Sequence, residues 1–140
     1  EDTKNTVDYL QTRVSQQVIF TFKAPEHPIF VAINPALHSW TIENLVKNAI
    51  DAMKGKGSLA IAISELEDVV KIKITDSGKG IPKNQFNSVF EPGFTTKKRG
   101  WGLGLSLTKR IVQEYHKGRI KVAHSEIGKG TTMQMSFKKV

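Results

Sequence analysis

Two runs of alternating apolar and polar residues, SLAIAIS (58–64) and VVKIKIT (69–75), constrain the fold of this chain most strongly. A period of two places successive side chains on opposite faces of a β-strand, so each run has one apolar face. Only residues 65–68 separate the runs, which predicts a β-hairpin. Because a hairpin cannot bury its apolar face alone, the chain must supply a second layer.

Helices are expected to supply that layer. Asn34-Pro35 is typical of a helix start, and apolar spacing continues to about Met53, ahead of two glycines. A second long helix is expected from about Gly102 to His116, ended by Gly118. Further strands are expected at 18–22, 29–33, 119–125 and 131–140. This order predicts an α/β (α+β) two-layer sandwich, with a mixed, mostly antiparallel sheet covered on one face by helices.

The length of 140 residues suits one domain, which we expect at 18–140. Residues 1–17 are polar and are interpreted as a linker or the end of a preceding helix. Cysteine is absent, which excludes disulfides, thiolate metal sites and a cysteine nucleophile. No apolar run approaches the roughly 20 residues that cross a bilayer. A cytoplasmic location is expected, with the parent protein either soluble or membrane-anchored.

The predicted first helix carries amides on its polar side. Asn44, Asn48 and Asp51 fall within about 60° of one another when each residue turns about 100°. Carboxamide oxygens are hard neutral ligands, suited to Mg²⁺ whose charge is already balanced by phosphates. Taken alone, this spacing favours polar asparagines on a solvated surface, and the metal site is only a hypothesis.

Asp76 follows the second strand of the hairpin and continues its inward-facing series. An inward carboxylate needs a hydrogen-bond donor, which the exocyclic amine of adenine could provide. Gly78 and Gly80 would then allow the backbone to approach a flat ring. The alternative is an aspartate that caps a glycine turn at the end of a strand.

Three glycines alternate at 100–104, before a predicted helix and after Thr95, Thr96 and Lys97. The spacing is neither a dinucleotide fingerprint nor a P-loop. Converging backbone N–H groups and a helix N-terminus nevertheless suit phosphate. Trp101 lies between two of these glycines, and the sequence leaves open whether its ring rests on the surface or covers a nucleotide.

The net charge of +8 permits a nucleic-acid, membrane or polyphosphate partner, or simply a solvated surface rich in lysine. The basic residues are scattered apart from 97–99, without the aromatic residues typical of a single-strand groove. Charge alone therefore does not decide between these alternatives.

Five segments in order resemble motifs of the ATP-binding catalytic domain of bacterial sensor histidine kinases. The superfamily also contains type II topoisomerase, mismatch-repair and heat-shock ATPases. NLVKNAIDA resembles the N box, DSGKGIP, GWGLGL and GKGT the three glycine boxes, and VFEPGFTTK the F box. The resemblance covers roughly residues 18–140 and implies a Bergerat-type ATP-binding fold with an ATP lid at 82–100.

The resemblance also implies the roles of individual residues. Asn44, Asn48 and Lys97 would be catalytic, and Asn48 would hold Mg²⁺. The nucleotide site would comprise Asn44, Asn48, Asp51, Asp76, Gly78, Gly80, Ile81, Phe90, Thr95, Thr96, Lys97, Gly100, Gly102, Leu103, Gly104, Leu105 and Thr131.

Two positions in the N-box helix bear on the reaction. Many sensor kinases have Lys or Arg three residues after the second asparagine, whereas this chain has Asp51, in a NAIDA variant that looks like the nitrogen-regulation type. Hydrolytic members of the superfamily have a glutamate where this chain has Asn44. An amide is a poor general base, which favours a kinase over an ATPase. Glu43 is a possible helper only.

None of the four histidines has the helical H-[DE] context of a sensor-kinase acceptor: His27, His38, His116 and His124. Phosphoryl transfer is therefore expected to a separate dimerisation and phosphoacceptor domain of the same parent, with a response regulator as an indirect partner. We expect a monomeric domain, a homodimeric parent and no nucleic acid. The alternatives are an ATPase or serine kinase of the superfamily, and a non-catalytic basic binding module.

Overall fold

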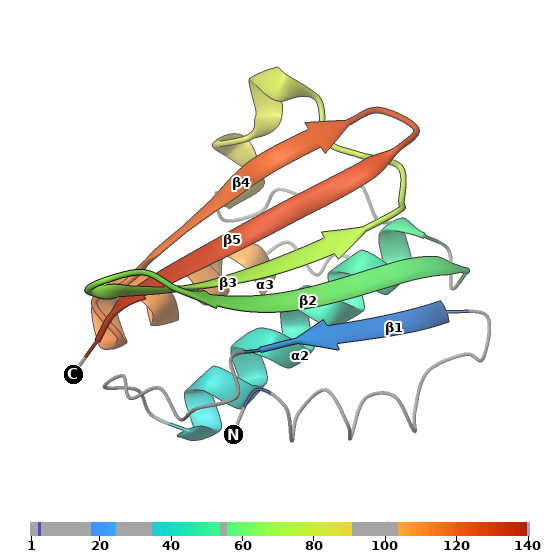
Figure 1. Cartoon of the computed structure of the whole chain (residues 1–140). Helices are drawn as coiled ribbons and strands as arrows, with labels where there is room; N and C mark the ends of the chain where they lie inside the picture. The colour runs from blue at the N-terminus through green and yellow to red at the C-terminus, as the bar shows by residue number, and fades with distance from the viewer. Residues whose placement is uncertain (1–2, 4–17, 25–34, 54–55, 91–103, 140) are drawn as a thin grey trace.

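The computed structural model describes residues 3, 18–24, 35–53, 56–90 and 104–139, which form one sheet and a layer of helices (Figure 1). The elements are β1 (Val18–Lys23), α2 (Pro35–Ala52), β2 (Gly57–Glu65), β3 (Val69–Asp76), the 3₁₀ turns η1 (Lys83–Gln85) and η2 (Ser88–Phe90), α3 (Gly104–Arg110), η3 (Ile111–Tyr115), β4 (Arg119–Glu126) and β5 (Gly130–Lys138). The predicted two-layer α/β sandwich is confirmed. The predicted strand at 29–33 lies outside the described residues.

The strands lie in the order β1-β2-β3-β5-β4. β1 is parallel to β2, and the other three pairs are antiparallel. Parallel neighbours need a crossover connection, and α2 lies between these two strands in the chain. In the β2–β3 hairpin, Ile61 pairs with Ile74, so the apolar residues of both runs share one face.

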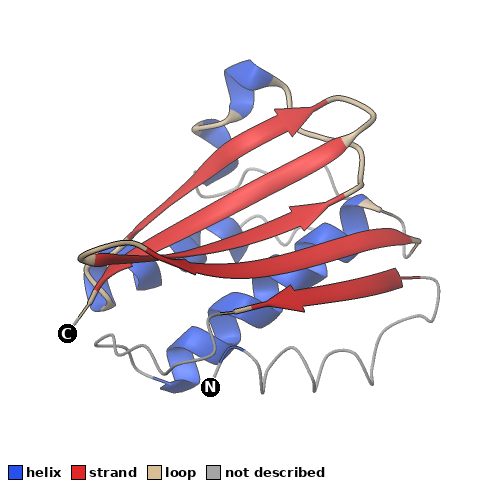
Figure 2. Cartoon of the chain, in the orientation of Figure 1, coloured by secondary structure: helices blue, strands red, loops and turns tan. Residues whose placement is uncertain are grey.

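The helices cover one face of the sheet, and the core lies between the two layers (Figure 2). The apolar residues of α2 recur three and four positions apart, which gives the helix one buried side. Burial of each isoleucine, leucine or valine side chain contributes about 1.5–3 kcal/mol. The two layers bury Ile42, Leu45, Val46 and Ala49 from α2 against Leu59, Ile61, Ile72, Ile74 and Met135 from the sheet.

The opposite face of the sheet carries exposed lysines. Lys73 on β3 and Lys121 on β4 are exposed, and both pair in register with Gln134 on β5. They alternate along their strands with buried Ile72, Ile74 and other apolar residues. The alternation of the strands therefore accounts for these lysines without a nucleic-acid partner.

The second helical segment differs from its prediction at the end. α3 stops at Arg110, and the chain continues as a wider turn in which the His116 N–H donates to the Ile111 carbonyl at 3.1 Å. The left-handed residue that ends the segment is Lys117, with φ 56°, rather than Gly118. Gly118 has a different role, because a β-carbon there would lie 2.5 Å from the Ser136 carbonyl oxygen on β5.

Two histidines lie in the core at the end of the sheet far from Asp76. His38 on α2 is 2% exposed and His116 is 8% exposed, and their ring centroids are 6.5 Å apart. Each ring also lies 6.1 Å from the Phe137 ring. His38 Nε2 is 2.6 Å from the Thr3 hydroxyl. The prediction of surface or core histidines is confirmed for these two and for exposed His124.

Burial of His116 makes the stability of the domain pH-dependent. Burial lowers the pKa of His116 below its ordinary value of 6.5, because charging the ring costs desolvation. The unfolded chain then binds the proton more readily than the folded chain. Stability should therefore be complete above pH 6.5 and decrease as the pH falls below it.

Thermal unfolding at pH 7.5 and 5.5 tests this expectation, with a lower melting temperature at pH 5.5 in the original chain. His116→Gln should reduce the difference between the two temperatures, and His124→Gln, on an exposed strand position, should leave it unchanged. Equal pH dependence in all three proteins would contradict the assignment to His116.

Candidate active site

The polar side of α2 separates the predicted amides into two environments. Asn48 and Asp51 line a pocket between α2 and the sheet. Asn44 donates instead from Nδ2 to the hydroxyl of Thr108 at 2.9 Å. Thr108 is fully buried in α3, so this hydrogen bond joins the two helices. Asn44 is not among the described residues that line the pocket.

Asp76 ends β3 and points inward, as the strand alternation predicted. Asp76 is 9% exposed, and its Oδ1 accepts a hydrogen bond from the Gly78 N–H at 2.8 Å. Burial raises the pKa of the carboxyl, while hydrogen bonds from the backbone N–H groups of Gly78 and Thr131 oppose that rise. The carboxylate is therefore both the cap of a glycine turn and an acceptor inside the pocket.

The glycines after Asp76 are required by contacts within the protein. A β-carbon on Gly78 would lie 2.7 Å from the Ala52 carbonyl oxygen, at the end of α2. Gly80 has φ +81°, and a β-carbon there would overlap the Glu126 backbone. Gly80 also lines the pocket, whereas Gly78 is not among its described lining residues.

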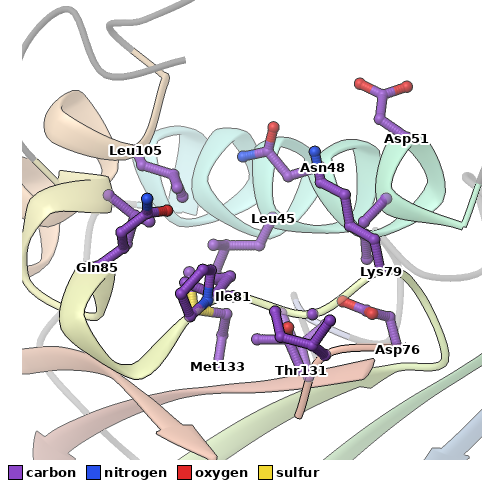
Figure 3. A pocket seen from close by; sticks show the side chains of 17 residues that line it. Leu45, Asn48, Asp51, Asp76, Lys79, Ile81, Gln85, Leu105, Thr131 and Met133 are labelled. Atoms are coloured by element: carbon purple, nitrogen blue, oxygen red, sulfur yellow. The ribbon is translucent and has the colours of Figure 1, made fainter. Parts of the chain in front are cut away.

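The pocket has a volume of about 550 Å³ and is mostly apolar (Figure 3). Of the predicted residues, it contains Asn48, Asp51, Asp76, Gly80, Ile81, Leu105 and Thr131. The other lining residues were not predicted as site residues: Leu45, Ala49, Ala52, Ile74, Lys79, Pro82, Gln85, Val89, Ile127 and Met133. The strand period could have identified Ile74, which lies two residues before Asp76 on the same face.

A network of hydroxyl hydrogen bonds holds the edge of the pocket in place. The sequence patterns did not predict this network. Ser125 Oγ lies 2.7 Å from Thr131 Oγ1, accepts from the Ile81 N–H at 2.7 Å and donates to the Gly130 carbonyl at 3.0 Å. It thereby joins β4, β5 and the loop after Asp76. The bulge between Val122 and His124 gives Ser125 its inward direction, because it shifts the register by one residue.

Several predicted residues lie elsewhere or cannot be placed. Phe90 belongs to the core, at 6% exposure, with the Lys109 ammonium 5.6 Å from its ring centroid. Gly104 is the first residue of α3. The segment predicted as a lid contains η1 and η2 up to residue 90. Outside the described residues lie Thr95, Thr96, Lys97, Gly100, Trp101, Gly102 and Leu103.

The described part of the pocket suits a flat heterocycle with an amino group. Ile74, Ile81 and Met133 line the same pocket as the Asp76 carboxylate, so a ring can pack on their apolar side chains while its amine donates to Asp76. Figure 3 shows Ile81 and Met133 next to Thr131, and Asp76 beyond it. Asn48 projects from α2 on the other side of the pocket. Among the described residues no cluster of three or more His, Cys, Asp or Glu could hold a metal, and no helix could span a bilayer.

Residues 37–140 match the sequence family described as histidine kinase-, DNA gyrase B-, and HSP90-like ATPase. The sensor histidine kinase ZraS of Escherichia coli K12 is 39% identical over 121 residues, which are 86% of this chain and 26% of ZraS. Sporulation kinase A of Bacillus subtilis 168 is 44% identical over 97 residues, 69% of this chain and 16% of that kinase. The chain thus spans about a quarter of the length of ZraS and a smaller share of the length of sporulation kinase A.

The fold is also found among solved structures. The catalytic domain of histidine kinase ThkA superposes with a TM-score of 0.87 at 25% identity, covering 99% of this chain and 90% of that domain. The pocket, the five ordered motifs and these similarities lead to one assignment. The chain belongs to the histidine kinase-, DNA gyrase B-, and HSP90-like ATPase family, and within it to the ATP-binding catalytic domains of sensor histidine kinases.

Proposed function

We propose that this chain binds Mg²⁺-ATP and transfers the γ-phosphoryl group to a histidine on a separate dimerisation and phosphoacceptor domain of its parent protein. One observation carries the proposal: a buried carboxylate, Asp76, lies in an apolar pocket that Asn48 also lines from α2. A nucleoside triphosphate has the matching parts, namely an amine on a flat ring and a charged chain that binds metal.

The residues divide the work of binding. Asp76 accepts from the adenine amine, and Ile81 and Thr131 border the base. Asn48 provides an amide oxygen for Mg²⁺, which when bound would neutralise phosphate charge. Thr95, Thr96 and Lys97, together with the glycines at 100, 102 and 104, supply donors to the phosphates in this proposal.

The environment of residues 43 and 44 favours transfer to a histidine over hydrolysis. Asn44 uses its amide N–H to bind Thr108, and an amide cannot accept the proton of an attacking water. Glu43 forms an ion pair with Lys47 at 2.9 Å and is not among the described residues lining the pocket. A histidine nitrogen needs no such base, because it is itself the nucleophile.

In the transfer, the bond between the γ-phosphorus and its bridging oxygen breaks, and ADP leaves with the electron pair. A new bond forms between phosphorus and the neutral imidazole nitrogen of the acceptor, whose ring then loses its proton to solvent. The contribution of this domain is positioning and charge neutralisation.

The acceptor is proposed to lie on another domain. His38 and His116 are buried in the core, and His124 is exposed on β4. His27 lies outside the described residues. We further propose a homodimeric parent whose catalytic domain is cytoplasmic, with a response regulator receiving the phosphoryl group. Binding is proposed to be independent of nucleic acid.

The first experiment is phosphoryl transfer from radiolabelled ATP. The chain alone with Mg²⁺ should acquire no label and release little phosphate. None of its four histidines has the helical H-[DE] context of an acceptor, and Asn44 stands where hydrolytic members of the superfamily have a glutamate. Adding the parent's dimerisation helices should label those helices, and replacing their acceptor histidine should abolish the label.

Two results distinguish the competing proposals. Steady phosphate release by the chain alone would favour an ATPase, and label on a serine of an added substrate would favour a serine kinase. A chain that binds no nucleotide but binds DNA in a salt-sensitive manner would instead be a basic binding module.

A further inference from the structure

We propose that Lys79 is a phosphate-contacting residue that supplies the positive charge missing at position 51. The inference rests on the proposed function, since it concerns the same ATP pocket. It assigns a specificity role to the variable residue inside the first glycine box: Lys79 would distinguish nucleotides that carry a phosphate chain from nucleosides.

The backbone of Lys79 is fixed on both sides. Its N–H donates to the Ala52 carbonyl at the end of α2, at 3.1 Å. Its carbonyl accepts from the Gly128 N–H, in the β4–β5 turn, at 2.9 Å. These two hydrogen bonds therefore fix the backbone position from which the exposed Lys79 side chain extends.

The direction of the side chain follows from this anchoring. In Figure 3 the Lys79 side chain extends from the loop toward α2, on the side where Asn48 lies. Lys79, Asn48 and Asp76 all line one pocket. A nucleotide with its base at Asp76 and its metal at Asn48 must therefore extend past the lysine.

The charges of the pocket show why a cation is needed here. Among the described lining residues the ionisable side chains are Asp51, Asp76 and Lys79, so lysine is the one basic group opposite two acids. The carboxylate of Asp51 points away from Asp76 in Figure 3. Without Lys79, the only charged side chains that the described pocket lining would present to a phosphate chain are the two carboxylates.

The test compares adenosine, ADP and ATP binding by calorimetry in the original chain and in Lys79→Met. Methionine retains the length and apolar stem of lysine but removes its charge. Because the ammonium is exposed, the loss should be moderate: about tenfold weaker binding of ADP and ATP, with adenosine unchanged. Lys83→Met is the matched control, since Lys83 is an exposed lysine in η1 outside the pocket lining.

A second variant tests the exchange of charge between the two positions. Adding Asp51→Lys to Lys79→Met should restore most of the ATP affinity, because it returns a cation to the pocket from α2. If Lys79→Met weakens adenosine and ATP binding equally, the lysine only packs against the nucleoside and does not contact phosphate. If ATP binding is unchanged, Lys79 does not contact the nucleotide. Absence of restoration by Asp51→Lys would contradict the shared role of the two positions. If the original chain binds none of the three compounds, the proposed function itself fails, whatever Lys79 does.

Discussion

Asp76→Asn is expected to weaken ATP binding by about 100-fold, equivalent to about 2.7 kcal/mol. The carboxylate has two acceptor oxygens, and the backbone N–H groups of Gly78 and Thr131 already approach it. An asparagine retains one acceptor and introduces an N–H₂ donor. Either a backbone N–H or the adenine amine then faces another donor inside a buried pocket, where an unmade hydrogen bond is costly. Calorimetric titration with ATP measures the loss.

The fold should survive this substitution, which separates binding from stability. Burial raises the pKa of Asp76 because the charged form is poorly solvated, so a neutral amide avoids that desolvation cost. Asp51→Asn provides the control: it makes the same chemical change at an exposed position of the pocket rim. Its ATP affinity should rise slightly, because the substitution removes one of the two carboxylates that oppose the phosphate chain. Unchanged ATP affinity in Asp76→Asn would place the adenine elsewhere.

The local patterns of the sequence predicted most of the fold. The period of two in the hairpin fixed which side of β3 faces the core, and it extended correctly to Asp76. The helix predicted from Pro35 to about Met53 is observed as Pro35–Ala52. In both elements the spacing of apolar residues along the sequence matches the spacing of buried residues in the structure. The local pattern is therefore sufficient to predict which side of the element faces the core.

Contacts between distant residues could not be predicted in this way. Asn44 and Thr108 are 64 positions apart, and only the packing of α2 on α3 brings their side chains together. Ser125 reaches Thr131 because a bulge shifts β4, which no alternation pattern shows. Lys79 belongs to a turn whose direction depends on both α2 and the β4–β5 turn. Such residues depend on register and packing, which are tertiary properties.

Gly130 connects the fold to the site at the point where β3 ends and β5 begins. It has φ +131°, and a β-carbon there would overlap the Asp76 carbonyl oxygen. The next residue, Thr131, pairs in register with Asp76. Only a residue without a side chain allows the two strand ends to approach closely enough for the Thr131 N–H to reach the carboxylate. The third glycine box therefore positions Asp76, the proposed acceptor for adenine, through backbone contact.

Gly130→Ala is accordingly expected to lower the free energy of unfolding by about 3 kcal/mol and the melting temperature by about 10 °C. ATP affinity should fall with it, because the separated strands move Asp76 away from its N–H donors. Gly128→Ala is the matched control: Gly128 also has a positive φ, +80°, but a β-carbon there meets nothing within 4 Å. Gly128→Ala should therefore lower the free energy of unfolding only by the left-handed backbone strain, about 1 kcal/mol, and should leave ATP binding unchanged. Thermal unfolding and ATP titration of the two variants separate the effect of left-handed backbone strain from that of steric overlap with Asp76. Equal melting temperatures would show that the ends of the two strands relax without cost. Gly130 would then not position the site.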